Sequence, residues 1–138
     1  MRTPMIGYRM YALALSAAAF AILCSTPPAN AASFDGSWNM FLVTTNGHCG
    51  TIKVGLVISG GKISSTSGKF VMRPIHIAGL VSGSGQARMN GVAGPRKAEG
   101  LGRFTRAKGN GKWNGTGPSG VCSGIWTAVR SGPQVAKR

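Results

Sequence analysis

Acidic side chains are nearly absent from this sequence. Its 138 residues include two, Asp35 and Glu99, against 16 lysines and arginines, so the formal net charge at neutral pH is +14. Both acids lie near the ends of predicted strands or turns, where they do not form the paired carboxylates that a glycosidase requires. An imbalance of this size creates a positive field that attracts polyanions whatever the fold. The composition therefore excludes one class of enzyme and indicates an anionic partner.

Catalytic and metal-binding patterns are missing as well. Serines, histidines and Asp35 are formally available for a Ser-His-Asp triad, but no Gly-x-Ser-x-Gly elbow joins a predicted strand to a helix. His48 lies beside Cys49, yet no Cys-x-x-Cys or His-x-x-x-His spacing accompanies it that would hold a metal or haem iron. We expect a protein that is not an enzyme and that has no metal site and no other cofactor.

Apolar runs long enough to cross a bilayer are also missing. The longest, Tyr11 to Leu23, has 13 residues, which is too short to span the hydrocarbon core. Arg2 and Arg9 precede it, and the small-x-small sequence Ala29-Asn30-Ala31 follows it, as in a secretory signal peptide. We predict that residues 1–31 are a signal peptide and that the mature protein is periplasmic or secreted, with no transmembrane span.

Cysteine is scarce, and one of the three, Cys24, lies in the predicted signal peptide. Lipidation at Cys24 is an alternative to cleavage, although the large Leu23 stands where that pathway requires a small residue. An uncleaved membrane anchor is another alternative. In an exported chain, the remaining Cys49 and Cys122 predict one disulfide. It would close a loop of about 74 residues and stabilise the fold by roughly 4 kcal/mol. Two free thiols or metal ligands are the alternative to this bridge.

Helical periodicity is absent from the mature part, and strict alternation takes its place. Trp38, Met40 and Leu42 share one face of a first strand. A second strand alternates in the same way, and its apolar face comprises Ile52, Val54, Leu56 and Ile58. Asn46-Gly47 and Gly60-Gly61 follow these strands, where they can supply the positive φ of hairpin turns. The pattern predicts antiparallel strands.

Eight short strands with turn signals between them predict an all-β fold. Their ranges are 34–44, 52–58, 62–67, 75 onward, 85–92, 97–105, 110–116 and 121–130. Pro74 cannot donate to a central ladder, so we expect a bulge or an edge before Ile75. Lys108-Gly109 is interpreted as a turn, whereas Asn90-Gly91 is placed inside a strand.

The regular spacing favours a small antiparallel up-and-down barrel over residues 32–132, without helix in the mature part, followed by a basic tail at 133–138. A β-sandwich is the alternative. In a closed barrel with an even number of strands, the last strand begins beside the end of the first, so a Cys49–Cys122 bridge would lock that seam. The resulting register would leave Phe41 and Val43 as a small exposed apolar strip.

Large and small side chains are unequally distributed among these strands. The predicted barrel-interior residues of the first strand and of the last two strands are bulky: Trp38, Met40, Leu42, Trp113 and Trp126. The strands between 85 and 105 place small residues inward: Ala87, Gly91, Ala98, Gly100 and Gly102. Complementary packing would fill the barrel, because eight strands enclose about the volume that side chains can occupy. The alternative is a one-sided cavity for a small apolar ligand.

The first strand opens with Gly36-Ser37-Trp38, and Arg130 lies late in the last strand. With eight predicted strands, this pattern resembles the calycins, the lipocalin and avidin type of barrel. In lipocalins an arginine from the end of the barrel covers the opening tryptophan, so the resemblance implies a contact between Trp38 and Arg130. Biotin binding is not implied, because avidin uses tyrosine and both tyrosines here lie in the signal segment. The opening Phe-Asp-Gly-Ser-Trp and closing Cys-Ser-Gly-Ile-Trp-Thr-Ala also resemble small exported proteobacterial proteins, which implies no activity.

Basic residues gather on three successive predicted strands and one turn. The predicted anion-binding residues are Arg88, Lys97, Arg103, Arg106, Lys108 and Lys112. Outside the cytoplasm we expect lipopolysaccharide, an acidic polysaccharide or an anionic lipid surface as the partner, and no physiological role for nucleic acid. A merely solubilising surface, a calycin-like carrier of a small apolar ligand and an exported protease-inhibitor barrel are the alternatives.

Overall fold

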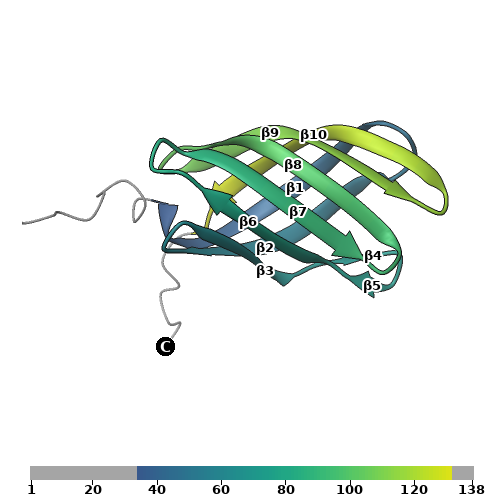
Figure 1. The fold of residues 1–138 in the computed structure, drawn as a ribbon, viewed down its shortest axis with the longest axis horizontal. Helices are drawn as coiled ribbons and strands as arrows, with labels where there is room; N and C mark the ends of the chain where they lie inside the picture. Colours follow the sequence, from purple (N-terminus) through teal and green to yellow (C-terminus); the bar gives the residue numbers. More distant parts are fainter. Residues whose placement is uncertain (1–33, 132–138) are drawn as a thin grey trace, which may run out of the picture.

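The chain folds into a closed antiparallel barrel of eight strands (Figure 1). The structure, a computed structural model, describes residues 34–131; the predicted signal peptide and basic tail lie outside the described residues. The barrel strands are β1 (Gly36–Asn46), β2 (Thr51–Ser59), β3 (Lys62–Ser67), β6 (His76–Val81), β7 (Gln86–Ala93), β8 (Arg96–Phe104), β9 (Lys108–Gly117) and β10 (Gly120–Arg130). Their order around the barrel is β1-β10-β9-β8-β7-β6-β3-β2, so the predicted up-and-down barrel is confirmed. The described residues contain no α-helix.

The seam between the first and last strands is closed as expected. β1 pairs with β10 in a register that places Trp38 opposite Arg130 and Leu42 opposite Trp126. A disulfide joins Cys49 and Cys122, whose Cα atoms are 6.2 Å apart. This separation is within the range that a disulfide tolerates. The predicted bridge is therefore confirmed, and it ties the loop after β1 to the start of β10.

Pro74 interrupts the barrel wall as its missing N–H requires. A small hairpin of β4 (Lys69–Phe70) and β5 (Arg73–Pro74) leaves the barrel there, and the wall resumes with β6 (Figure 1). Its turn residues, Val71 and Met72, have φ of 48° and 64°, a conformation that is rare for any residue other than glycine and a true outlier for valine. The expected edge before Ile75 is thus an excursion of the chain over one end of the barrel.

Turn positions were predicted correctly for one glycine pair and wrongly for a second site. Gly60-Gly61 joins β2 to β3 with φ of 57° and 79°, as a two-residue hairpin requires. The predicted turn at Lys108-Gly109 is wrong, because both residues belong to β9. A Cβ at Gly109 would lie 2.8 Å from the Phe104 ring. This glycine is needed for close packing inside the barrel, and the chain turns earlier, before Lys108.

The exterior beside the seam also differs from the prediction. Phe41 and Val43 were expected to form an exposed apolar strip, yet both are half-buried. The Lys53 ammonium nitrogen lies 6.0 Å from the centroid of the Phe41 ring, so a lysine on the neighbouring strand shields that ring. Ile125, which pairs with Val43, is exposed in this region, as is Val129 farther along β10.

Candidate functional site

The barrel has two unlike ends. We call the end that contains Phe34, Phe104 and Arg130 the closed end, and the end that contains the disulfide and the β4–β5 hairpin the open end. At the closed end, Trp38 and Phe104 meet edge to face with ring centroids 4.9 Å apart, and Phe104 lies 5.3 Å from Trp126. These three rings are almost completely buried and fill this half of the interior.

Glycines make room for the rings, as the distribution of large and small residues predicted. A Cβ at Gly102 would lie 2.4 Å from the Trp126 ring, and one at Gly111 would lie 2.5 Å from the indole nitrogen. That nitrogen donates to the carbonyl of Leu101 at 3.2 Å, so the ring is also hydrogen-bonded to the wall. No Cβ is tolerated where an indole lies flat against the sheet.

Arg130 covers the closed end. Its guanidinium carbon lies 4.6 Å from the centroid of the Trp38 ring, so the contact implied by the lipocalin resemblance is present. The same guanidinium donates to the backbone carbonyls of Asp35 and Arg106. Trp38 in turn donates to the carbonyl of Phe34 at 3.0 Å. Arg130 is therefore a structural cation that holds the chain before β1 and the β8–β9 turn together.

The open half is hollow. A cavity of about 90 Å³ extends inward from the open end and is lined mainly by apolar side chains: Leu42, Val54, Ile75, Ile77, Trp113 and the Cys49–Cys122 disulfide. A smaller void of about 30 Å³ continues toward Met40, Met89 and Trp126. Phe70 of the hairpin and Arg96 of β8 also line the larger cavity, and the Arg96 guanidinium lies 5.4 Å from the centroid of the Phe70 ring. All five predicted interior residues are buried, but Leu42 and Trp113 line the cavity, so the interior is filled only toward the closed end.

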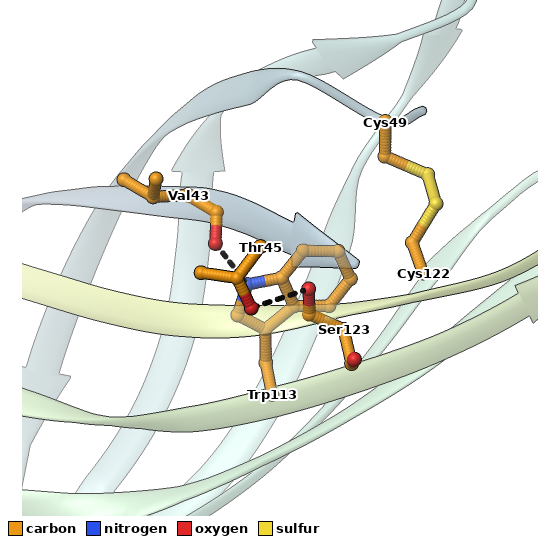
Figure 2. The surroundings of a disulfide bond; sticks show 6 residues. All are labelled: Val43, Thr45, Cys49, Trp113, Cys122 and Ser123. Atoms are coloured by element: carbon orange, nitrogen blue, oxygen red, sulfur yellow. Dashed lines mark hydrogen bonds between the residues drawn. A yellow bond between two sulfur atoms is a disulfide. The ribbon is translucent and has the colours of Figure 1, made fainter. Parts of the chain in front are cut away.

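Trp113 lines both the cavity at the open end and the smaller void beyond it. Figure 2 shows its indole ring turned toward β1, where the ring nitrogen donates to the carbonyl of Val43 at 3.4 Å. Beside it, the Thr45 hydroxyl donates to the carbonyl of Ser123, and the disulfide lies farther out toward the open end (Figure 2). Ile75 and Ile77 complete the cavity wall. These residues were not predicted to line a site, because the β4–β5 hairpin interrupts the strand pattern just before them.

The predicted anion-binding residues lie on one side of the barrel exterior, which we call the basic outer face: Arg88, Lys97, Arg103, Arg106, Lys108 and Lys112. All are exposed. They lie on β7, β8 and β9, which are neighbours in the barrel, and on the β8–β9 turn. Lys108 lies in β9 rather than in the turn where it was expected, but it still belongs to this surface. The residues predicted to bind an anion therefore lie on one side of the molecule.

The charge distribution is asymmetric. Seven of the twelve lysines and arginines among the described residues lie between β7 and β9, namely the basic outer face together with Arg96. The opposite wall is much less charged: β2, four strands away from β8 in either direction, carries only Lys53, and β3 beside it carries only Lys62. Glu99 is the one acid of the face, paired between Asn90 and Asn114. The barrel is thus strongly cationic on one side.

A depression of about 540 Å³ adjoins this face on the outside of β8, β9 and β10. Leu101, Lys112, Asn114 and Ile125 contribute to its walls, and it ends at Thr45 and Asn46 of β1. The pairing of β1 with β10 shifts register between Thr44 and Asn46, which bends the wall at this point. The depression combines one cation, Lys112, and one carboxylate, Glu99, with amides and aliphatic side chains.

The histidines and the possible metal ligands were considered next, together with membrane-spanning helices. His48 and His76 are both exposed, and no group of three or more histidines, cysteines or acids within residues 34–131 could hold a metal ion. Between Phe34 and Ser131 there is no helix of the length and apolarity needed to cross a membrane.

Comparisons with known proteins support the fold and nothing finer. No protein-family model matches the chain, and no curated protein matches it. The solved structure of a redesigned beta barrel is similar with a TM-score of 0.50 and 16% sequence identity, over 75% of this chain and 96% of that chain. At this identity the likeness concerns the architecture alone.

Proposed function

We propose that this is an exported, non-enzymatic binding protein whose basic outer face recognises an anionic component of the cell envelope. The observation that carries the proposal is the concentration of cations on three adjacent strands, opposite a wall with few charges. Such a one-sided field orients the molecule toward a polyanion before contact is made. The disulfide supports an oxidising location, periplasmic or extracellular, where lipopolysaccharide, acidic polysaccharides and anionic lipids are the available polyanions.

Charge density, rather than any one ion pair, would supply the affinity. Single exposed ion pairs contribute on the order of 0 to 1 kcal/mol and are screened by salt. Several cations that approach one polyanion act together, and their summed attraction falls as the screening length shortens from about 30 Å at 0.01 M salt to about 8 Å at 0.15 M. The proposed binding must therefore weaken steeply with added salt.

The test compares two triple variants with the same change in net charge. Arg88→Gln, Arg103→Gln and Lys112→Gln together remove three cations from the basic outer face, whereas the matched control, Lys53→Gln, Lys62→Gln and Lys69→Gln, removes three exposed lysines elsewhere. We expect the first to reduce retention on immobilised lipopolysaccharide far more than the second, with retention of the parent lost at high salt. Equal losses, or retention that is independent of salt, would contradict the proposal.

A second candidate function rests on a different observation, the apolar cavity of about 90 Å³ at the open end. It supports a calycin-like carrier of a small apolar ligand, because apolar sites of this kind exclude water and accept hydrophobic guests. Titration with medium-chain alcohols should change the tryptophan emission through Trp113, and Trp113→Phe should remove most of that change. Ile75→Phe, which replaces an aliphatic side chain by a larger aromatic ring in the cavity, should abolish binding. A response that persists in Ile75→Phe would exclude the cavity as the site.

A further inference from the structure

The basic outer face also contains exposed aliphatic side chains, and these are interleaved with the cations. Leu101 is 57% exposed and lies directly between Arg88 and Lys112, its partners on the two neighbouring strands. Beyond them, Leu80 pairs with Arg88 and is 64% exposed, and Ile125 pairs with Lys112 and is 47% exposed. From β6 to β10, one cross-strand row thus alternates aliphatic and basic residues.

The row is a continuous surface rather than a scatter of single apolar residues. Directly opposed residues of an antiparallel pair have Cβ atoms roughly 5 Å apart, so each aliphatic side chain is within reach of the stem of a basic neighbour. The methylene stems of arginine and lysine are themselves apolar and extend this surface, while their charged ends can reach outward. Leu101 and Ile125 also form walls of the outer depression, with Lys112 between them.

This combination distinguishes the polyanions that the proposed function leaves open. A soluble polysaccharide offers charges and hydroxyls but nothing apolar, so exposed leucine and isoleucine would gain little from it. An anionic bilayer offers phosphates at its surface and acyl chains just beneath them, at the two levels that basic ends and aliphatic side chains reach. Relying on the proposed function, we infer that the basic outer face docks on an anionic lipid bilayer, with Leu101 and Ile125 entering the boundary between headgroups and acyl chains.

The curvature of the barrel fixes the orientation. A flat surface can contact only neighbouring strands, and β8, which carries Leu101, lies at the centre of the basic outer face. Arg88 and Lys112 flank Leu101 on either side and would reach lipid phosphates together with Arg103. Lys53 on the opposite wall would then point away from the membrane.

Binding to lipid vesicles tests the docking on a bilayer, and binding to a soluble polyanion tests the proposed recognition of anions in general. The double variant Leu101→Ser and Ile125→Ser is compared with the parent on vesicles of phosphatidylglycerol and phosphatidylcholine and on dextran sulfate. We expect at least about a tenfold loss of vesicle affinity, the change that follows when one leucine-sized side chain no longer leaves water. Binding to dextran sulfate and the melting temperature should not change, because both side chains are exposed.

Met72→Ser is the matched control, because Met72 is more exposed than either residue, at 92%, but lies on the β4–β5 hairpin outside the row. It should retain vesicle affinity; an equal loss there would overturn the assignment to this face. If the double variant binds vesicles like the parent, or loses dextran sulfate binding equally, the lipid inference is wrong. The triple variant of Arg88, Arg103 and Lys112 should bind both vesicles and dextran sulfate more weakly than the parent. If it does, the proposed function stands even where the lipid inference fails. If the triple variant weakens neither, the proposed function is wrong and the inference falls with it.

Discussion

The closed and open halves of the barrel are built from the same strands, yet one is solid and the other is hollow. In the closed half, Trp38, Phe104 and Trp126 pack against one another across the interior, and glycines beside them avoid Cβ atoms that would collide with the rings. In the open half, Trp113 is the only indole, and Gly91 and Ala98 of the facing strands leave space that nothing fills. Glycine therefore has opposite consequences in the two halves, since it fits a ring in one and leaves a void in the other.

The largest test of this comparison removes one indole from each half. Trp126→Ala should lower the free energy of unfolding by about 3 to 5 kcal/mol, because it opens a cavity in the filled half. Trp113→Ala should cost less, because its ring already borders empty space. Chemical denaturation of both variants measures the difference. If Trp113→Ala were the more damaging, the filled half would not be the main source of stability.

The Cys49–Cys122 disulfide joins β10 to the loop after β1 at the open end, where side-chain packing contributes less to stability. Replacing both Cys49 and Cys122 by serine should lower the free energy of unfolding by roughly 2 to 5 kcal/mol, since the unfolded chain regains the freedom of a long loop. Reducing agent should lower the melting temperature of the parent but leave that of the double variant unchanged. A double variant that melts with the parent would show that pairing of β1 with β10 closes the seam unaided.

Two glycine-to-alanine substitutions compare how tightly the two halves are packed, because each adds a single methyl group. Gly111→Ala should cost about 1 to 3 kcal/mol, because its Cβ would lie 2.0 Å from the carbonyl of Leu101 and 2.5 Å from Trp126. Gly91→Ala should change stability by less than about 0.5 kcal/mol, because its nearest neighbour is the Ile77 side chain at 3.5 Å. Thermal melts of the pair are sufficient. Similar costs for both would mean that the open half is packed as tightly as the closed half.

The smallest expected effect separates two cations that lie over aromatic rings. Arg130→Gln should destabilise the protein by about 1 to 2 kcal/mol, because the guanidinium covers Trp38 and also donates to two backbone carbonyls. Arg96→Gln at the open end, where the guanidinium lies over Phe70, should cost no more than about 0.5 kcal/mol. Urea midpoints distinguish the two. The reverse order would show that the closed end does not depend on its arginine.

Local pattern was enough for much of the fold. The alternation of Trp38, Met40 and Leu42 with outward residues, and the glycine pair at 60 and 61, depend only on neighbours in the chain, so strands and turn could be placed without knowing their partners. Gly109 shows where this reasoning ends. Glycine next to lysine is typical of a turn, but here the residue lies in a strand because Phe104 occupies the space its Cβ would need.

The eight barrel strands, the Cys49–Cys122 pairing and the side of the barrel that carries the cations could be predicted from the sequence, because strand alternation and an even strand count leave little choice of neighbour. The contact of Arg130 with Trp38 was implied by the lipocalin resemblance alone. Only the tertiary structure decided that the interior is filled at one end and hollow at the other, and that Leu101 lies between Arg88 and Lys112. Those properties depend on the register between strands and on the volumes that meet across the barrel. Residues distant in the chain set both, so no local pattern contains them.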